Sequence, residues 1–389
     1  MSFPRWAFLV CALLLCSAID VVAVLRAPPG VDHLPGDCPY YVATTISLVE
    51  DRDFDLRNQL ERDGKTLRDH ESFFAVLPSG AILPKHSTLM PILLIPFYLV
   101  AGKWGFLAFN VLQMVLLLWG ISVLGGNTPT SRIVAIAGLV LSPWLSYVFN
   151  YSPDIFGTLL VVWAYVAGRK HRLVWCGVLC ALAVWAKVYL AVILLPLGWL
   201  LVLHPWRQWL KLIAPALLAL LPMFGLHTLL YGSPLATGYD FEARFDEAGE
   251  LYPLGHAARF HQPFFAGLWN LLFDGQLGLV TKSPIWLGWL LLAVVWKSFN
   301  TEKHLWSILM TIGLWLNVLL FAKYDEWNAS IHGNRFLFPS LALSLAVQAP
   351  CLNLLWQRYL QSRQHSSSSN HEVPSAAPAV HPPDTRPGR

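Results

Sequence analysis

The sequence predicts an all-α polytopic membrane protein, a bundle of about ten transmembrane helices, and three observations support this class. Of the 389 residues, 56% are hydrophobic and only 13% are charged, whereas soluble domains carry about 25% charged residues. The mean hydropathy is +0.51. Apolar runs of roughly 15–22 residues recur along most of the chain, separated by short basic or Gly/Pro breaks. The net charge of +4 is spread over many short loops, which is typical of membrane orientation and not of a nucleic-acid partner.

Ten apolar segments are predicted to cross the membrane. The first segment, 6–24, has no convincing small-x-small cleavage site and contains Asp20, so we interpret it as an uncleaved span and not as a signal peptide. The other nine segments are 105–124, 132–149, 154–168, 173–187, 188–204, 210–231, 283–297, 304–322 and 337–357.

A further apolar run, 89–101, is predicted to stay on one face of the membrane. At 1.5 Å per residue it reaches only about 20 Å, less than the roughly 30 Å of the hydrocarbon core. If it does not cross, both termini are cytoplasmic, and so are eleven basic residues: Arg5, Arg132, Arg169, Lys170, Arg172, Arg207, Lys211, Lys297, Lys303, Arg358 and Arg363. If it crosses, all of them except Arg5 move outside. The positive-inside rule therefore predicts a re-entrant or interfacial helix on the outer face.

This topology gathers four connections on the outer face, namely 25–88, 150–154, 232–282 and 323–336. Two of them are long, acidic and aromatic, and long ordered loops usually carry function. The cytoplasmic connections are short and basic. We therefore expect one transmembrane domain over 1–360. The Ser/Pro/His-rich segment 361–389 is expected to be a disordered cytoplasmic tail.

Six stretches follow one another in an informative order. They are "GDCPYYVATTISLVEDRDFDL", "PKHSTLMPILLIPFYLVAG", "YSPDIFGTLLVVWAY", "ALAVWAKVYLAVILLP", "YGSPLATGY" and "GNRFLFPSLAL". In this order the chain resembles the GT-C superfamily of membrane glycosyltransferases, and most closely the aminoarabinose and protein mannosyl transferases, which use polyprenyl-phosphate-linked sugars. The resemblance covers most of residues 1–350. It implies a GT-C-like bundle with juxtamembrane or re-entrant helices in the first outer loop.

The resemblance also implies an activity. It is inverting transfer of a hexose or pentose from a polyprenyl-phosphate donor to an unknown lipid, glycan or protein acceptor, at the outer face of the cytoplasmic (inner) membrane. A non-catalytic relative, or a transporter of a lipid-linked intermediate, is the alternative for a bundle of this kind. The family assigns no certain cofactor. Some members use a divalent cation, Mg²⁺ or Mn²⁺, but the spacing of the acidic run Glu50–Asp55 does not identify a metal site.

Asp37 matches the essential aspartate of the family's first outer loop and is the candidate catalytic residue. Transfer to a hydroxyl needs a base for the acceptor proton, and a carboxylate whose pKa is raised by partial burial can act as one. Two alternatives remain open. Asp37 could cap the helix expected from Tyr40 to Glu50, and Asp20 is a rival carboxylate, because acidic residues inside spans are functional candidates.

Fixed positive charge on the outer face would hold the donor phosphate. Five residues are candidates for this role: Lys85, His86, Lys187, Lys282 and Arg335. Any one of them could instead extend to lipid headgroups, so the prediction concerns the group. Arg335 and Lys85 rank first, because arginine can bind phosphate through two nitrogens and lysine acts as a point charge.

Aromatic and acidic residues of the outer loops are candidates for binding the sugar or the acceptor. They are Tyr40, Tyr41, Asp154, Tyr239, Asp240, Trp327 and His332. Asp154 could equally cap the helix that begins beside it, and the acidic residues of 232–282 could belong to an ordinary solvated loop.

Overall fold

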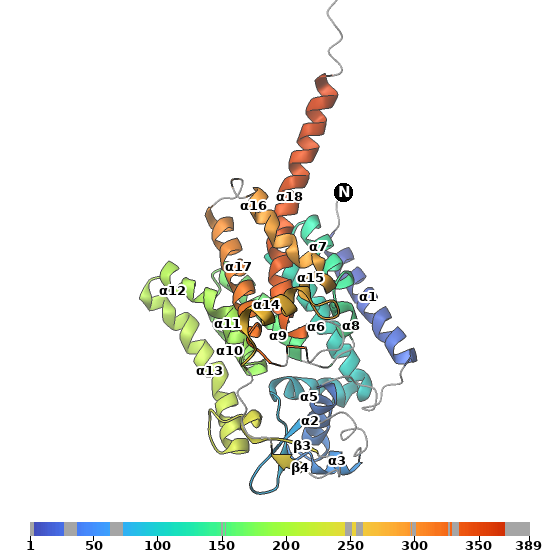
Figure 1. The fold of residues 1–389 in the computed structure, drawn as a ribbon, viewed down its shortest axis with the longest axis vertical. Coiled ribbons are helices and arrows are strands. Elements are labelled where there is room, and N and C mark those ends of the chain that lie inside the picture. The colour runs from blue at the N-terminus through green and yellow to red at the C-terminus, as the bar shows by residue number, and fades with distance from the viewer. Residues whose placement is uncertain are drawn as a thin grey trace, which may run out of the picture.

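The computed structural model describes residues 4–26, 37–62, 73–148, 151, 153–245, 251–253, 260–295, 297, 301–325, 327–328 and 334–369. These residues form a bundle of helices with a small sheet at one end (Figure 1). The predicted membrane fold is confirmed, and the spans correspond to helices or to broken helices.

The first half of the bundle follows the predicted segments closely. Its helices are α1 (Arg5–Arg26), α6 (Lys103–Leu124), α7 (Pro129–Val140), α8 (Trp144–Tyr147), α9 (Pro153–Arg169), α10 (Leu173–Ala186), α11 (Leu190–Leu194), η2 (Leu195–Gly198) and α12 (Trp199–Leu203). The predicted span 132–149 is broken between α7 and α8, where Pro143 precedes α8. Proline lacks the N–H that would continue the helical hydrogen bonds, which accounts for the break.

The second half contains α13 (Trp206–Tyr231), η3 (Gly238–Phe241), α14 (Phe264–Phe273), α15 (Leu279–Lys282), η4 (Pro284–Leu290), α16 (Leu291–Val295), α17 (Thr301–Phe321), η6 (Arg335–Leu337) and α18 (Phe338–Ser369). Among the described helices, five are long and apolar enough to span a membrane: α1, α6, α13, α17 and the segment Arg335–Gln364. The disordered tail was predicted to begin at residue 361, but α18 continues to Ser369. The sequence "QSRQHSSSS" holds no proline or glycine that would end the helix earlier.

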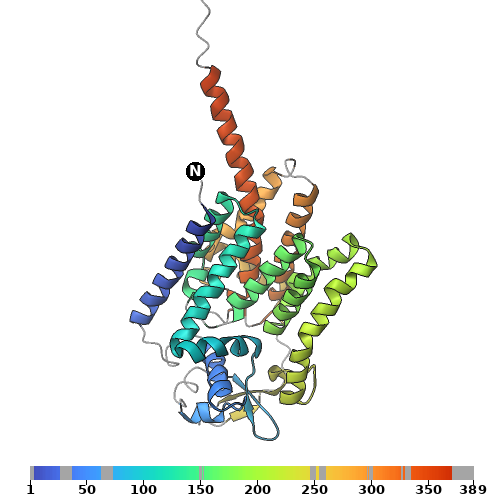
Figure 2. The same cartoon turned by 180° about the vertical axis from the view of Figure 1, so that it is seen from behind.

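The helix α5 (Leu89–Ala101) has the bounds of the predicted non-crossing run. It lies across the end of the bundle, beside α2 (Cys38–Glu50), in both views (Figures 1 and 2). Gly102 separates α5 from α6 with φ +56, a left-handed conformation that glycine adopts without strain and that lets the chain turn sharply into α6.

A four-stranded antiparallel sheet was not predicted. Its order is β2 (Ile82–Leu83), β1 (Phe73–Val76), β3 (Glu242–Phe245) and β4 (Leu251–Pro253). The pairing of Phe74 with Ala243 joins the first outer loop to the third, 169 positions apart by their numbers. The sheet, η3, α2 and the short helix α3 (Arg57–Arg62) lie at the end of the bundle opposite the N-terminus and the end of α18 (Figure 1). The expected gathering of these loops on one face is therefore present.

Candidate active site

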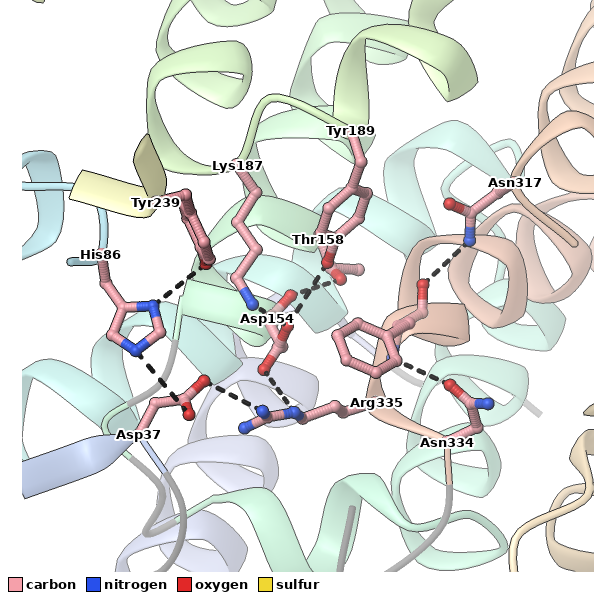
Figure 3. A network of polar contacts seen from close by, with 11 residues as sticks. Asp37, His86, Asp154, Thr158, Lys187, Tyr189, Tyr239, Asn317, Asn334 and Arg335 are labelled. Carbon is pink, nitrogen blue, oxygen red and sulfur yellow. Dashed lines mark hydrogen bonds and ion pairs between the residues drawn. The ribbon is translucent and has the colours of Figure 1, made fainter. Parts of the chain in front are cut away.

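Asp37 lies directly before α2 and does not cap it. Its backbone has helical angles, φ −81 and ψ −5, and its side chain makes no capping hydrogen bond. Instead, its Oδ2 accepts a hydrogen bond of 2.9 Å from Nη2 of Arg335 (Figure 3). The carboxylate keeps 21% of its surface exposed, so it can meet a ligand. The structure thus removes the capping alternative.

Arg335 bridges two carboxylates. Besides its bond to Asp37, its Nε lies 3.6 Å from Oδ2 of Asp154. Its backbone begins η6, where the Asn334 side chain accepts from the N–H of Phe336, and Asn317 of α17 donates to the carbonyl of Phe336 at 3.0 Å. These contacts hold the guanidinium between the start of α2 and the start of α9.

Asp154 occupies the first turn of α9 with its side chain fully buried. Its Oδ1 accepts 2.8 Å from Nζ of Lys187 and 3.4 Å from the hydroxyl of Tyr189. Lys187 reaches it because α10 ends there in an extended conformation, φ −154 and ψ 117, before α11 begins. The predicted break between two spans is therefore what brings this lysine to the site.

His86 touches Asp37 from the other side. Its Nε2 lies 3.8 Å from Oδ1 of Asp37, and its Nδ1 lies 3.1 Å from the hydroxyl of Tyr239. Its ring stacks on Tyr41 with centroids 5.5 Å apart, and Tyr40 lies at 5.7 Å. Burial lowers the pKa of His86 to about 3, against the opposing effect of Asp37, so the ring is neutral at pH 7. His86 therefore acts as a hydrogen-bonding group, and the predicted positive charge on it is wrong.

Lys85 forms a buried ion pair with a residue of the third outer loop. Its Nζ lies 3.2 Å from Oε1 of Glu242, and each side chain is 4% exposed. The ammonium also lies 5.2 Å from the centre of the Tyr239 ring. The Cβ of an alanine at Gly238 would lie 2.5 Å from the Cα of Lys85, so the third loop packs directly on the segment that carries this lysine.

The pKa of Asp37 is held below its usual range. Burial alone would raise it, but the positive charges around it, that of Arg335 foremost, lower it by more. The raised pKa that would have made Asp37 a strong base is therefore wrong for this resting arrangement. Three cations face three carboxylates: Lys85 with Glu242, Lys187 with Asp154, and Arg335 between Asp154 and Asp37. The site is close to electrically neutral, and an arriving anion must compete with carboxylates for these cations.

Three of the predicted residues, Lys282, Asp240 and Trp327, are not brought into this cluster. Lys282 is exposed at the end of α15, and its predicted place at the phosphate is not supported. The Asp240 side chain accepts from the N–H and hydroxyl of Thr237, forming a capping box for η3. Trp327 contributes its carbonyl to Asn334. His332 lies outside the described residues.

Glu242 and Tyr189 belong to the site, but the sequence analysis did not select them. Glu242 was one of several acids in a polar loop, and only strand pairing of β1 with β3 sets it opposite Lys85. Tyr189 lies two positions after Lys187, and nothing in the sequence around it indicated that its hydroxyl would reach Asp154.

No group of three metal-ligating side chains that could hold an ion occurs in the described part of the chain. Two carboxylates of the cluster, Asp37 and Asp154, both face Arg335, which supplies the positive charge that a divalent cation would bring. This donor set does not fit a metal ion.

No protein-family model matches the sequence, and no curated protein matches it by sequence. Two solved structures match by fold. The crystal structure of ArnT from Cupriavidus metallidurans bound to undecaprenyl phosphate has TM-score 0.59 and 11% identity, over 94% of this chain and 64% of that one. The apo structure of the same protein has TM-score 0.56 and 11% identity, over 93% and 62%. This chain thus spans a little under two thirds of ArnT's length. It has the fold of ArnT, the GT-C-like membrane bundle that the sequence analysis expected.

Proposed function

We propose that this protein is an integral-membrane glycosyltransferase of the inner membrane, with both termini cytoplasmic. It takes a sugar from a polyprenyl-phosphate donor and transfers it, with inversion, to an acceptor at the outer face. The observation that carries the proposal is the part-exposed Asp37 carboxylate bonded to Arg335, with Lys187 and Lys85 in the same cluster. The fold supports it, since ArnT has been solved with undecaprenyl phosphate bound.

The donor phosphate would take Arg335 as its first contact. A guanidinium presents several N–H groups in one plane and can hold two phosphate oxygens together. Lys85 supplies a second cation, which Glu242 neutralises until an anion arrives. The apolar tail of the donor would remain in the lipid, because the site lies at the end of a bundle of apolar helices.

Asp37 would accept the proton of the acceptor. The acceptor oxygen attacks the anomeric carbon, its bond to that carbon forms, and the bond from the carbon to the phosphate oxygen breaks. Polyprenyl phosphate leaves with the electron pair, and the hydroxyl proton passes to Asp37. Because Arg335 lowers the pKa of Asp37, a phosphate that draws Arg335 away raises it again. Asp37 therefore becomes a stronger base when the donor is bound.

A transfer assay tests this proposal. Purified protein in liposomes is given a panel of radiolabelled undecaprenyl-phosphate sugars and a membrane extract as acceptor source. We expect label to move to a new product, and Asp37→Asn to reduce its rate by about 100-fold or more, the usual contribution of a general base. Asp274→Asn is the matched control, because that carboxylate accepts from the N–H groups of Gln276 and Leu277 in its own loop. Full transfer by Asp37→Asn would remove this residue from its role. Binding of the lipid without any transfer would favour a non-catalytic or transporting protein.

A further inference from the structure

The ring of His86 is held in one orientation by its neighbours. It stacks on Tyr41 with an interplanar angle of 28°, and Tyr40 lies against it at a tilt of 48°. The hydroxyl of Tyr239 lies 3.1 Å from its Nδ1 (Figure 3). The other ring nitrogen, Nε2, is therefore turned toward the carboxylate of Asp37.

A gap separates this nitrogen from the carboxylate. Nε2 lies 3.8 Å from Oδ1 of Asp37, which is beyond the length of a hydrogen bond. His86 is only 8% exposed, and its Nε2 has no hydrogen-bond partner among the described residues. A buried polar atom without a partner is costly, and a ligand atom in the gap would satisfy it. Oδ1 of Asp37 faces the same gap, since Arg335 donates to Oδ2. One oxygen atom can lie about 2.8 Å from both Nε2 and Oδ1, within hydrogen-bond range of each.

Asp37 and Tyr239 together select one tautomer of His86. The ring is neutral at pH 7, so one of its nitrogens carries a proton and the other accepts a hydrogen bond. The ionised carboxylate of Asp37 favours the proton on Nε2, because a lone pair facing it would be repelled. Nδ1 is then the acceptor, and the Tyr239 hydroxyl donates to it. His86 thus presents an N–H donor beside the proposed base.

A neutral hydroxyl matches these two groups. Its oxygen can accept from the Nε2–H of His86, and its proton can go to Oδ1 of Asp37. A phosphate dianion has no proton for Asp37 and is repelled by its charge. An ammonium group has no lone pair for the N–H of His86. The gap therefore favours a hydroxyl over either charged group.

We propose that His86 holds a neutral acceptor hydroxyl against Asp37, and that Tyr239 keeps His86 in the donating tautomer. This inference rests on the proposed function and names the reacting group of the acceptor. His86 touches the reacting oxygen, whereas Tyr239 is a positioning residue that acts through His86. When the hydroxyl proton passes to Oδ1 of Asp37, the Nε2–H stays on His86, so the imidazole remains neutral throughout. The donor phosphate has its own contacts at Arg335 and Lys85.

The transfer assay with increasing amounts of membrane extract tests the role of His86. His86→Leu should lower the maximal rate about fivefold to tenfold, the usual effect of losing one neutral hydrogen bond, and should need more extract for half of that rate. His86→Gln should recover most of the loss, because its amide supplies an N–H donor. Both variants should bind undecaprenyl phosphate and the radiolabelled donor as the wild type does, because Arg335 and Lys85 are unchanged.

Tyr239→Phe tests the positioning role. It should lower the rate about threefold in the wild-type background, and it should cause no further loss in His86→Leu, because Tyr239 acts through His86. Tyr359→Phe is the matched control, since this tyrosine is 46% exposed on α18. An equal loss from Tyr239→Phe in both backgrounds would show that Tyr239 contacts the substrate itself, and would overturn its positioning role.

Nitrogen-15 NMR of the histidine rings reads the tautomer in the absence of any substrate. The signals that His86→Gln removes should be those of a protonated Nε2 and an unprotonated Nδ1. The opposite assignment would refute the inference, even if His86→Leu failed to fold.

The remaining outcomes separate this inference from the proposed function. Transfer by His86→Leu at the wild-type rate would remove His86 from the acceptor site and leave the proposed transferase standing. Weaker donor binding by His86→Leu, with an unchanged dependence on the extract, would place a hydroxyl of the donor sugar in the gap, and the inference would be wrong. If the wild type transfers no sugar, the proposed function itself fails, and the inference fails with it.

Discussion

Removing Lys187 should destabilise the protein by a predictable amount. Asp154 is fully buried, and Lys187→Met removes the ammonium that lies 2.8 Å from its Oδ1, while Arg335 remains 3.6 Å from its Oδ2. Breaking a buried ion pair by deleting one partner costs about 3–5 kcal/mol, and the remaining Arg335 places the cost near the lower end, about 3 kcal/mol. At an unfolding entropy near 2.1 cal/mol/K per residue, that lowers the melting temperature of this chain by about 4 °C.

The assay is thermal unfolding of the purified protein in one detergent at one scan rate, followed by tryptophan fluorescence. Adding Asp154→Asn to Lys187→Met removes the stranded charge, so the double variant should recover most of the loss. Lys170→Met, at an exposed lysine that follows α9, is the control and should leave the midpoint unchanged. The inferred coupling between Lys187 and Asp154 is refuted if Lys187→Met has the same melting temperature as the control. It is also refuted if the double variant has a lower melting temperature than Lys187→Met.

Three further predictions concern the same face. In the unfolded chain a histidine takes up a proton near pH 6.5, whereas buried His86, with its pKa lowered to about 3, stays neutral. The free energy of unfolding should therefore fall by roughly 3 kcal/mol as the pH falls from 7 to 4.5. His86→Gln should remove that part of the pH dependence. If the melting temperatures at pH 7 and pH 4.5 differ as much in His86→Gln as in the wild type, the prediction is contradicted. Gly238→Ala should lower both the melting temperature and the rate of sugar transfer, because its Cβ would clash with the Lys85 backbone. Gly225→Ala, which has open space around it, should lower neither. Equal melting temperatures of the two variants would contradict the close packing of Gly238 on Lys85. Lys282→Met should leave undecaprenyl phosphate binding intact, because Lys282 is exposed at the end of α15. Weaker binding by this variant would show that Lys282 contacts the phosphate.

Much of the bundle follows from hydropathy and charge. Every predicted span corresponds to a helix or broken helix, because lipid requires backbone hydrogen bonds to be made within each segment. The bounds of α5 are those of the apolar run 89–101 in the sequence. The sheet could not be predicted, since β1 and β3 are only four residues each and pair across 169 positions.

The residues of the candidate site could be predicted in part, but their pairing could not. Asp37, Arg335, Lys187 and His86 were selected by the resemblance and by the topology, and the structure brings them together. Sequence reasoning could not show that each cation already faces a carboxylate. The Lys85–Glu242 pair depends on the sheet register, and the pairing of Lys187 with Asp154 depends on how α9 lies beside the break after α10.

Asp37 and a donor phosphate are proposed to compete for one guanidinium, and this competition is the central claim. Undecaprenyl phosphate binding and sugar transfer should therefore be measured on the same preparation of Asp37→Asn. The amide no longer holds Arg335 as tightly as the carboxylate does at 2.9 Å, so we expect binding to tighten while transfer is lost. Transfer at the wild-type rate, or binding lost together with transfer, would contradict the account.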